Sequence, residues 1–374
     1  MDLDFTEEQE MLREMVRAVC VEHSPVDVVR AMEDDPVGFP KALWEKLAEV
    51  EVHGILIPES YGGSGMSILD AEVVYEEFGR ALAPIPHFVS CVLSASALLA
   101  AGNEDQKKTW LPKIASGEAI LTPAWLEPKN GFGPKGIQAK AEVSGDEAVI
   151  TGTKLHVQFA SSAQQLLVLA RTGEGAEDVD LFLVDPQSEG VELEQQKTIA
   201  SDTQYKVTLN GVRVPLAHRV GEAGTGWQTW DKVMHDGIIL AAAQAIGGAT
   251  RSLEITCEYA AERTQFDKPL ASFQSISHYL ADASTAVSGG TTLVQEAAWA
   301  RSTGRSVASL APMAKLFACQ TYRDMTAMSL QVFGGVGFTV EYDAQLYFRR
   351  AKQLQLSWWD TSYLEGLVAA SVLD

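Results

Sequence analysis

The sequence predicts an α+β fold with three consecutive domains: an N-terminal helical domain over residues 1–120, a central antiparallel β domain over 121–220, and a C-terminal four-helix bundle over 221–374. Two observations carry this prediction. Hydrophobic residues recur with the helical period of about 3.6 near both ends of the chain, and with the strand period of about two between them. The chain also has 374 residues, 46% of them hydrophobic, which is enough for a large core in several packed layers.

The first domain is predicted to be helical throughout. The stretch FTEEQEMLREMVRAV carries apolar residues at Phe5, Met11, Leu12 and Val16, and Thr6 stands before it as an N-cap. Further helices are predicted for FPKALWEKLAEVEV, SILDAEVVYEEFGRALA and NEDQKKTWLPKIASGE, the last of which ends at its Pro-Lys pair. The intervening IPESYGGSG is predicted to be a loop, because proline and closely spaced glycines interrupt regular structure.

The hydrophobic pattern of the sequence changes from the helical to the strand period after about Leu121. Val, Ile and Thr alternate with polar residues in KAEVSGDEAVITGTKLHVQFA, QQLLVLARTG and VDLFLVDP, and Gly or Asp interrupts these runs every 8–12 residues, as in antiparallel sheets. Long helical patterns return from about Gly226, and long helices joined by short loops predict an antiparallel bundle.

The composition excludes several classes of partner. A net charge of −21 repels phosphate backbones and anionic lipid, so we expect no nucleic acid and no membrane surface as partner. The four cysteines have no CxxC spacing and mostly apolar neighbours, which predicts reduced, buried thiols in a cytoplasmic protein. The acidic N-terminus does not resemble a signal peptide, and no apolar run reaches the ~20 residues that span a bilayer.

Several stretches resemble the acyl-CoA dehydrogenase family over nearly the whole chain. They are FTEEQEMLRE, IPESYGGSG, WLPKIASGE, AAERTQFDKPLASFQSISHYLAD and LQVFGGVGFTVEYDAQLYFRRAK. The resemblance implies an FAD-dependent oxidoreductase that binds its flavin at a subunit interface and an acyl-CoA thioester as substrate. In such enzymes a glutamate removes the α-proton while the β-hydrogen passes as hydride to the flavin, and an acceptor such as electron-transfer flavoprotein reoxidises it.

The C-terminal stretch RRAKQLQLSWWDTSYLEGLVAAS is most similar to a branch that degrades steroid and bile-acid side chains. Enzymes of this branch are often built from two different acyl-CoA dehydrogenase-like subunits. The resemblance therefore implies a heterotetramer, or a homo-oligomer of this chain, and a bulky acyl group. The apolar bundle helices also favour assembly as a dimer of dimers, because such faces need burial.

The resemblance assigns two segments to FAD, and it assigns the second of them to the adenosine diphosphate half of the neighbouring subunit's FAD. In AERTQF, Arg263 suits a pyrophosphate because its planar guanidinium bonds two oxygens, and Phe266 packs on the cofactor. In QVFGGVGF, the assigned residues are Gln331, Gly334 and Gly335, where glycine lets a backbone approach a ligand. The alternative readings are a solvated arginine with a core phenylalanine, and a turn that ends a helix.

The same segment departs from the family at Asp267, where glycine is usual, and a carboxylate there weakens a pyrophosphate site. The flavin-ring segments depart further. In AWLEPKNGFG, Leu126, Phe132 and Gly133 replace the family's hydroxyl and carboxyl residues. In HVQF, Gln158 replaces Ser or Thr and is still able to bond a flavin carbonyl. His156 replaces Trp there, and we interpret it as a structural residue.

The catalytic base is the largest departure. Aligned on the family's pattern, Trp358 occupies the glutamate position and Trp359 the following glycine, and an indole cannot take a proton. A minority of the family carries its glutamate on an earlier helix, where this chain has Gly237. Asp236 is then the best replacement, one residue and about 100° away on the helix, although a helix-face acid also has a purely structural explanation. Weaker options are His235, Asp360 and Glu365, of which the two acids are expected to face solvent or to cap a helix.

Three functions fit this pattern. The first is a non-catalytic subunit that completes the FAD site of a partner. The second is an active homo-oligomeric acyl-CoA dehydrogenase with Asp236 as relocated base. The third is a non-redox enzyme acting on a CoA thioester.

Overall fold

The computed structural model describes residues 4–129 and 131–373, and its order of helices, sheet and helices confirms the predicted fold class. Packing divides the chain into two compact units. The bundle unit comprises Met1–Arg30, Ile68–Ala83 and Ile238–Asp374, and the sheet unit comprises Ala31–Ser67 and Pro84–Gly237. Since these units interleave along the chain, we keep the three consecutive domains, with boundaries near residues 120 and 220, as a proposal.

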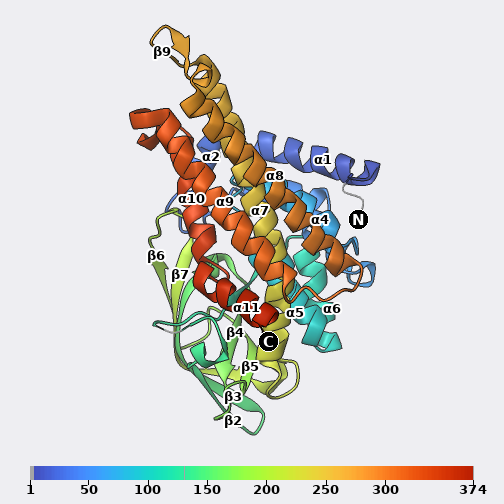
Figure 1. Ribbon diagram of the computed structural model, residues 1–374. Coiled ribbons are helices and arrows are strands. Elements are labelled where there is room, and N and C mark those ends of the chain that lie inside the picture. Colours follow the sequence, from blue (N-terminus) through green and yellow to red (C-terminus); the bar gives the residue numbers. More distant parts are fainter. Residues whose placement is uncertain (1–3, 130, 374) are drawn as a thin grey trace. The chain divides into compact units, whose positions relative to one another are not determined.

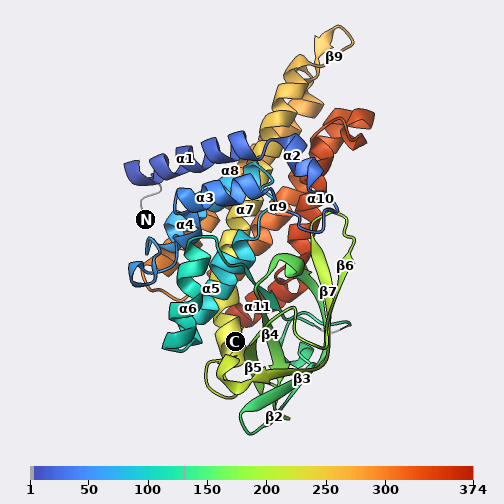
Figure 2. The ribbon, with the colours of Figure 1, turned by 180° about the vertical axis from the view of Figure 1, so that it is seen from behind.

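The bundle unit is built from long helices that lie side by side (Figure 1). Helix α9 packs against α8, α10 and α11, and α4 packs against α1 and α8 (Figure 2). The helices that lie wholly or largely in this unit are α1 (Glu7–His23), α2 (Val26–Ala31), α4 (Ile68–Arg80), α7 (Gly226–Glu262), α8 (Gln274–Ser302), α9 (Leu310–Phe333), α10 (Ala344–Leu356) and α11 (Thr361–Leu373).

Local sequence explains several helix ends. Thr6 caps α1 as predicted, in a capping box whose other member is Gln9. Asn103 and Gln106 form the same box at α6 (Glu104–Ala115). The predicted end of α6 at its Pro-Lys pair is two residues too early, because the helix includes Pro112 and ends at Ala115.

The sheet unit holds a mostly antiparallel sheet with strand order β6-β7-β3-β2-β4-β5-β8. β1 pairs with β4 in parallel, and so does β2 at one residue pair, so the sheet is mixed rather than purely antiparallel. The strands are β1 (Leu121–Ala124), β2 (Lys140–Ser144), β3 (Glu147–Gln158), β4 (Gln165–Arg171), β5 (Val179–Val184), β6 (Val191–Gln196), β7 (Gln204–Pro215) and β8 (Arg219–Val220).

Short helices complete the sheet unit. They include α3 (Lys41–Glu49), the 3-10 turn η1 (Val52–Gly54), the π-helix η3 (Phe88–Ser94), α5 (Ala95–Ala101) and α6. Of the four cysteines, Cys20, Cys91 and Cys319 are buried, but Cys257 is exposed on α7, which corrects the expectation of buried thiols throughout. In the described residues, no helix combines the length and apolarity needed to cross a membrane.

Candidate active site and flavin-binding residues

The position that the resemblance assigns to the family's catalytic glutamate lies in a short connection between α10 and α11, residues 357–360, which we call the tryptophan turn. Trp358 and Trp359 both adopt left-handed backbone, with φ of 54° and 72°. Their side chains are buried, with exposures of 7% and 0%. A non-glycine residue in this backbone region is strained, so the family's glycine at position 359 is replaced here at a conformational cost.

A buried lysine holds this turn. Lys315 on α9 donates from Nζ to the carbonyl oxygens of Trp359 at 2.9 Å and Leu354 at 3.2 Å. Lys315 is fully buried, and burial lowers the pKa of its ammonium group. The ring of Trp359 lies 5.4 Å from that of Tyr363. The backbone of the turn and the Trp359 ring are therefore held in place, and Lys315 is a residue that the sequence analysis did not single out.

The acids near the tryptophan turn have structural positions. Asp360 accepts a hydrogen bond at 2.9 Å from the backbone N–H of Tyr363, so it caps α11, as expected. Glu365 is exposed on α11. Within the turn itself, therefore, the only carboxylate already serves a helix end.

The alternative glutamate position lies on α7 in the sheet unit. A Cβ atom added at Gly237 would stand 2.6 Å from Leu93 Cδ2 and 3.6 Å from Phe88 Cζ, so a larger residue here would require the Leu93 side chain to shift. Asp236 is half-buried beside it. His235 is bonded within its own helix, with Nδ1 2.9 Å from the carbonyl oxygen of Asp231. Of these residues, Asp236 stays the candidate base.

The segment expected at the flavin ring is fixed by a buried ion pair. Lys154 Nζ lies 2.6 Å from Glu127 Oε1, and both side chains are almost fully buried. Glu127 also accepts hydrogen bonds from the backbone N–H groups of Gln138 and Ala139. This pair anchors the loop after β1, and the sequence reading missed it because its members are 27 positions apart.

The side chains that this loop carries are apolar where the family has hydroxyl groups. The ring of Phe132 lies 5.9 Å from that of Trp125, and Leu126 is half-buried. Gln158 is half-buried at the end of β3, where its carbonyl oxygen accepts a hydrogen bond from Thr122 Oγ1 at 2.7 Å. Its own side-chain amide stands at the position where the family has Ser or Thr.

His156 is a structural residue, in agreement with our interpretation. Its φ is 57°, and the register between β3 and β7 shifts between Lys154 and Val157. Its Nδ1 lies 2.8 Å from Gln204 Oε1, and its backbone N–H donates to Gln196 Oε1. It stabilises a β-bulge.

Arg263 and Phe266 lie at the end of α7 in the bundle unit. A short hairpin, β9 (Thr264–Gln265) and β10 (Lys268–Pro269), joins α7 to α8 at the far end of these helices (Figure 1). Its two turn residues, Phe266 and Asp267, have φ of 54° and 59°. This left-handed backbone explains why glycine suits position 267 and why aspartate is tolerated there. Phe266 is 88% exposed, and Arg263 is exposed with no side-chain partner among the described residues.

Gln331, Gly334 and Gly335 lie where α9 ends. Residues 334–337, which we call the glycine turn, begin with Gly334 at φ 66° and ψ −144°. A Cβ atom added at Gly334 or Gly335 would meet nothing within 4 Å, and Gln331 is exposed. The ring of Phe333 stacks on that of Tyr259 at 4.1 Å. Since Tyr259 precedes Arg263 by about one helical turn, the fold brings the two predicted diphosphate-binding segments together.

The two groups of residues predicted to bind FAD, one in the bundle unit and one in the sheet unit, therefore differ in their fit. The glycine turn and Arg263 offer open backbone and an uncommitted guanidinium, which suit a diphosphate. The loop of Leu126 and Phe132 offers apolar side chains where the polar edge of a flavin ring needs hydrogen-bond partners. The residues present fit the diphosphate end better than the ring end.

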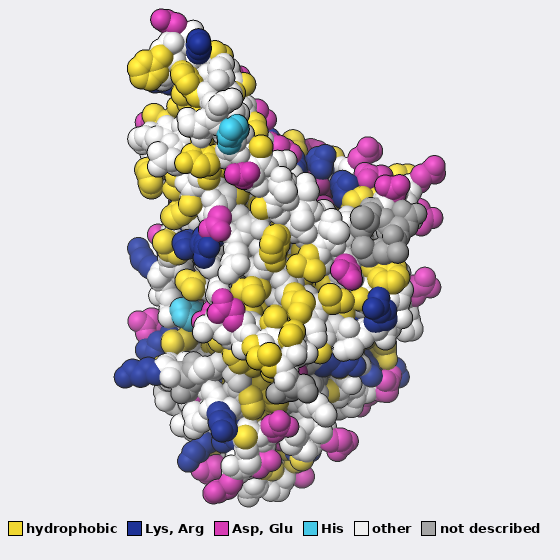
Figure 3. Space-filling model, viewed as in Figure 1, with side chains coloured by type: hydrophobic (Ala, Val, Ile, Leu, Met, Phe, Trp, Pro, Cys, Tyr) yellow, Lys and Arg dark blue, Asp and Glu magenta, His cyan; other side chains and the backbone are white. Residues whose placement is uncertain are grey.

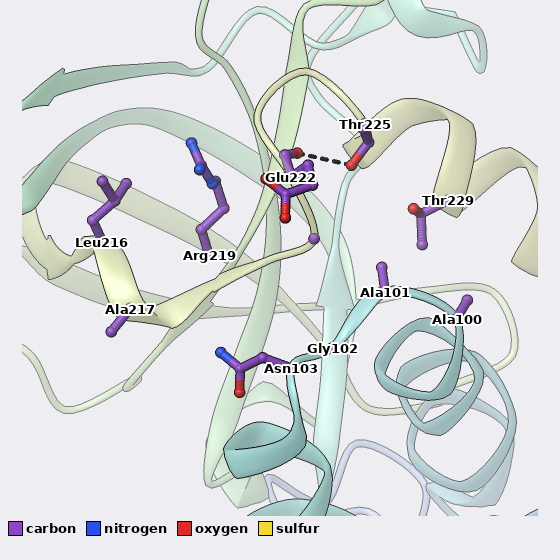
Figure 4. A pocket seen from close by; sticks show the side chains of 11 residues that line it. Ala100, Ala101, Gly102, Asn103, Leu216, Ala217, Arg219, Glu222, Thr225 and Thr229 are labelled. Carbon is purple, nitrogen blue, oxygen red and sulfur yellow. Dashed lines mark hydrogen bonds between the residues drawn. The ribbon is translucent and has the colours of Figure 1, made fainter.

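A polar hollow of about 630 Å³ lies elsewhere in the sheet unit (Figure 4). Asn103, Arg219, Glu222, Thr225 and Thr229 are among its lining residues. Arg219 is paired with Asp180 at 3.6 Å, and Thr225 donates to the backbone of Glu222. None of the residues predicted for catalysis or flavin binding lines this hollow.

Comparisons with known proteins agree with this fold. Three family descriptions match in order: "Acyl-CoA dehydrogenase, N-terminal domain" over residues 6–118, "Acyl-CoA dehydrogenase, middle domain" over 123–212, and "Acyl-CoA dehydrogenase, C-terminal domain" over 224–357. The probable acyl-CoA dehydrogenase YngJ of Bacillus subtilis is 33% identical over 383 residues, covering 100% of both chains.

Two solved structures are also similar. A chain of the ChsE4–ChsE5 complex of Mycobacterium tuberculosis is 27% identical with a TM-score of 0.91, covering 100% of this chain and 99% of that one. A chain of the steroid acyl-CoA dehydrogenase Tcur3481–Tcur3483 is 28% identical with a TM-score of 0.88, covering 98% and 99%. The chain therefore belongs to the acyl-CoA dehydrogenase family of FAD-dependent oxidoreductases.

Proposed function

We propose that this chain is the non-catalytic subunit of a two-subunit, FAD-dependent α,β-dehydrogenase of acyl-CoA thioesters. A second acyl-CoA dehydrogenase-like chain would supply the glutamate base and the flavin-ring contacts. One observation carries the proposal: the tryptophan turn holds two buried indoles where the base belongs, while the glycine turn and Arg263 stay open in the same unit.

The tryptophan turn argues against a base that swings into place. Lys315 is bonded to the carbonyl oxygens of Trp359 and Leu354, so the backbone cannot shift without leaving a buried ammonium group short of partners. An indole offers no lone pair with a useful pKa. The position is therefore committed to packing.

The open residues would serve the FAD of the partner subunit. Arg263 would bond the diphosphate through its guanidinium, and Phe266 would pack on the adenine end. The backbone N–H groups of Gly334 and Gly335 would approach the diphosphate, and Gln331 would donate from its amide. The flavin, when bound, accepts the hydride from the β-carbon of the substrate.

The assembly is proposed to be a heterotetramer. The bundle face in Figure 3 carries many apolar side chains over α8, α9 and α11, with few charged ones between them. Exposed apolar residues of these helices and of α10 include Tyr279, Phe317, Leu356 and Val372. Faces of this kind are buried in assemblies. The similarity to a chain of a two-component complex supports a different subunit as the partner.

The acyl group is proposed to be bulky, as in steroid side-chain degradation. The similarity to a chain of a steroid acyl-CoA dehydrogenase supports this substrate class. Electron-transfer flavoprotein is the proposed acceptor, as the family resemblance implies. A cytoplasmic location remains part of the proposal and is supported by four cysteines that are all unpaired in the structure.

A second candidate function rests on Asp236. It is a half-buried carboxylate on α7 next to the family's alternative base position, so an active homo-oligomer with this base is the competing proposal. A non-redox reaction on a CoA thioester is the third candidate, and it alone requires no flavin.

The flavin spectrum separates these candidates. The chain would be purified alone and together with a second acyl-CoA dehydrogenase-like chain from the same organism, each with added FAD. We expect a colourless single chain and a yellow complex. A single chain that binds FAD tightly supports the homo-oligomer, and a complex without flavin that still transforms a CoA thioester supports the non-redox enzyme.

A further inference from the structure

Three potential metal ligands come together inside the sheet unit. They are His53, His87 and Cys91, and one donor atom from each lies within 4.8 Å of the other two. All three side chains are buried, with at most 1% of each exposed. The cluster includes none of the residues predicted for catalysis or flavin binding.

Local backbone features place these side chains. His53 lies in η1, which begins after Glu51 in left-handed backbone with φ of 60°. His87 directly precedes the π-helix η3, and Cys91 lies within it. π-helical turns are rare and often occur at functional sites, because the widened turn re-aims its side chains.

The hydrogen bonds of both imidazoles fix which nitrogen carries the proton. His53 Nε2 lies 2.9 Å from the carbonyl oxygen of Trp44, and His87 Nε2 lies 3.1 Å from that of Val52. A carbonyl oxygen only accepts, so each Nε2 donates and each Nδ1 keeps its lone pair. Metal-binding histidines are held in this way, with the second nitrogen donating to a carbonyl or carboxylate.

His53 Nδ1 provides an independent sign of a missing ligand. It is buried and has no hydrogen-bond partner among the described residues. Buried acceptors in proteins are almost always paired with protein or water. The imidazole cannot turn to find a partner, because Trp44 stacks on it at 3.7 Å and is itself bonded to the carbonyl oxygen of Gly117.

We propose that His53 Nδ1, His87 Nδ1 and Cys91 Sγ bind a d¹⁰ transition-metal ion, zinc(II) or copper(I). Two nitrogens and one sulfur suit these ions, whereas calcium and magnesium require oxygen ligands. Binding converts the Cys91 thiol to a thiolate and releases its proton to solvent. The resulting charge is +1 for zinc(II) and zero for copper(I), so the absence of a carboxylate from the cluster favours copper(I).

The ion would join η1 to η3 and so stabilise the sheet unit. Bond lengths of about 2.0–2.3 Å bring the ligand atoms somewhat closer than in the metal-free geometry. A metal that binds during folding, or while η3 is locally open, meets this requirement, because the ligands can then close on the ion and the Cys91 proton can leave to solvent.

The test is the metal content of the full chain as purified, by plasma mass spectrometry, and again after loading. Cobalt(II) serves as the probe for zinc, because a bound thiolate gives a sulfur-to-cobalt absorption band. Copper(I) is titrated in a separate arm against a competing chelator under reducing conditions. The variants are Cys91→Ser and His53→Gln, and Cys20→Ser is the control because Cys20 is also buried but lies in the bundle unit.

We expect one equivalent of cobalt(II) or copper(I) in the natural chain and in Cys20→Ser, and at least about tenfold weaker binding in Cys91→Ser. The bound ion should raise the melting temperature of the natural chain but not that of either ligand variant. If Cys91→Ser does not fold, the proposal is tested with His53→Gln, by the same measurements of metal affinity and melting temperature. No binding of either ion, or equal binding in the ligand variants, would show that the cluster is only a packed group of buried side chains.

Discussion

The tryptophan turn and the glycine turn lie in the same bundle unit and contrast in almost every physical respect. At the tryptophan turn, large side chains are buried in strained backbone, and a buried lysine holds the carbonyl groups. At Gly334 and Gly335 in the glycine turn, the backbone is exposed and space remains where side chains would stand. We therefore call the tryptophan turn, where side chains fill the space, the filled end, and the glycine turn, where the backbone is accessible, the open end.

The contrast teaches where this chain has kept the capacity to bind a ligand. A site that lost its purpose at random would not stay open at one end and become fully packed at the other. The resemblance assigns the base position to the tryptophan turn and the diphosphate contacts to the glycine turn. The predictions below test each end separately.

The largest effect concerns turnover. The isolated chain should desaturate acyl-CoA at least about 10²-fold more slowly than the complex with its partner, because a positioned base contributes about 10²–10⁴-fold. Trp358→Glu should not rescue the isolated chain, because Leu126 and Phe132 still lack polar groups for the ring. Turnover with a dye as acceptor measures both.

Asp236→Asn in the complex is the matched control. We expect its turnover to stay within about twofold of the natural complex, since the partner supplies the base. An isolated chain that is yellow and active, and that Asp236→Asn inactivates, would contradict the accessory role and identify Asp236 as the base.

The second effect concerns stability at the filled end. Trp359→Ala should lower the free energy of unfolding by about 3–5 kcal/mol, because a fully buried indole is lost. Trp359→Gly should be about 1 kcal/mol less harmful, because glycine accepts a φ of 72°. Denaturant unfolding of the chain measures both. Phe338, 68% exposed after the glycine turn, is the control, and Phe338→Ala should change stability by no more than about 0.5 kcal/mol.

The conformation of the glycine turn could be predicted from the sequence better than that of the tryptophan turn. The open backbone at Gly334 and Gly335 could be predicted from the sequence, because glycine has no side chain to cover the backbone. The left-handed backbone at Trp358 and Trp359 could not be predicted, since tryptophan has no preference for it. The role of Lys315 could not be predicted either. A lysine within an apolar helical stretch does not indicate which distant carbonyl oxygens it will bond.

The fold as a whole follows more directly from local sequence. The Thr6 cap and the change from helical to strand periodicity depend on neighbouring residues, and both are confirmed. The parallel pairing of β1 with β4 depends on residues more than 40 positions apart, so periodicity alone cannot give it. The same limit applies to the pair of Lys154 and Glu127.

The third effect concerns the open end. Arg263→Ala should weaken FAD binding by the complex by about 1.5–3 kcal/mol, because a charge-assisted contact is lost. The stability of the chain itself should not change, since Arg263 has no side-chain partner among the described residues. Fluorescence titration of the flavin-free complex measures the affinity, and unaltered affinity would exclude Arg263 from the site.

The smallest effect concerns a buried acid far from both turns in the sequence. Glu72 on α4 is fully buried, and burial together with the neighbouring Glu76 raises its pKa well above the ordinary 4.5. A raised pKa in the folded state means that the stabilising contribution is complete below pH 4.5 and is lost as pH rises through the folded value. Glu72→Gln should therefore leave stability unchanged at pH 4 and increase it by about 1 kcal/mol at pH 8.

Glu72 also sharpens the contrast between function and packing. Perturbed carboxyl groups often mark catalytic sites, yet this one lies on α4, beside Glu76 and its ion pair with Arg13 at 3.2 Å. We therefore expect Glu72→Gln to shift the pH dependence of unfolding, followed by circular dichroism, without changing the turnover of the complex. A loss of turnover without a matching loss of stability would show that Glu72 on α4 takes part in the reaction. The functional residues would then not be confined to the partner subunit and the glycine turn.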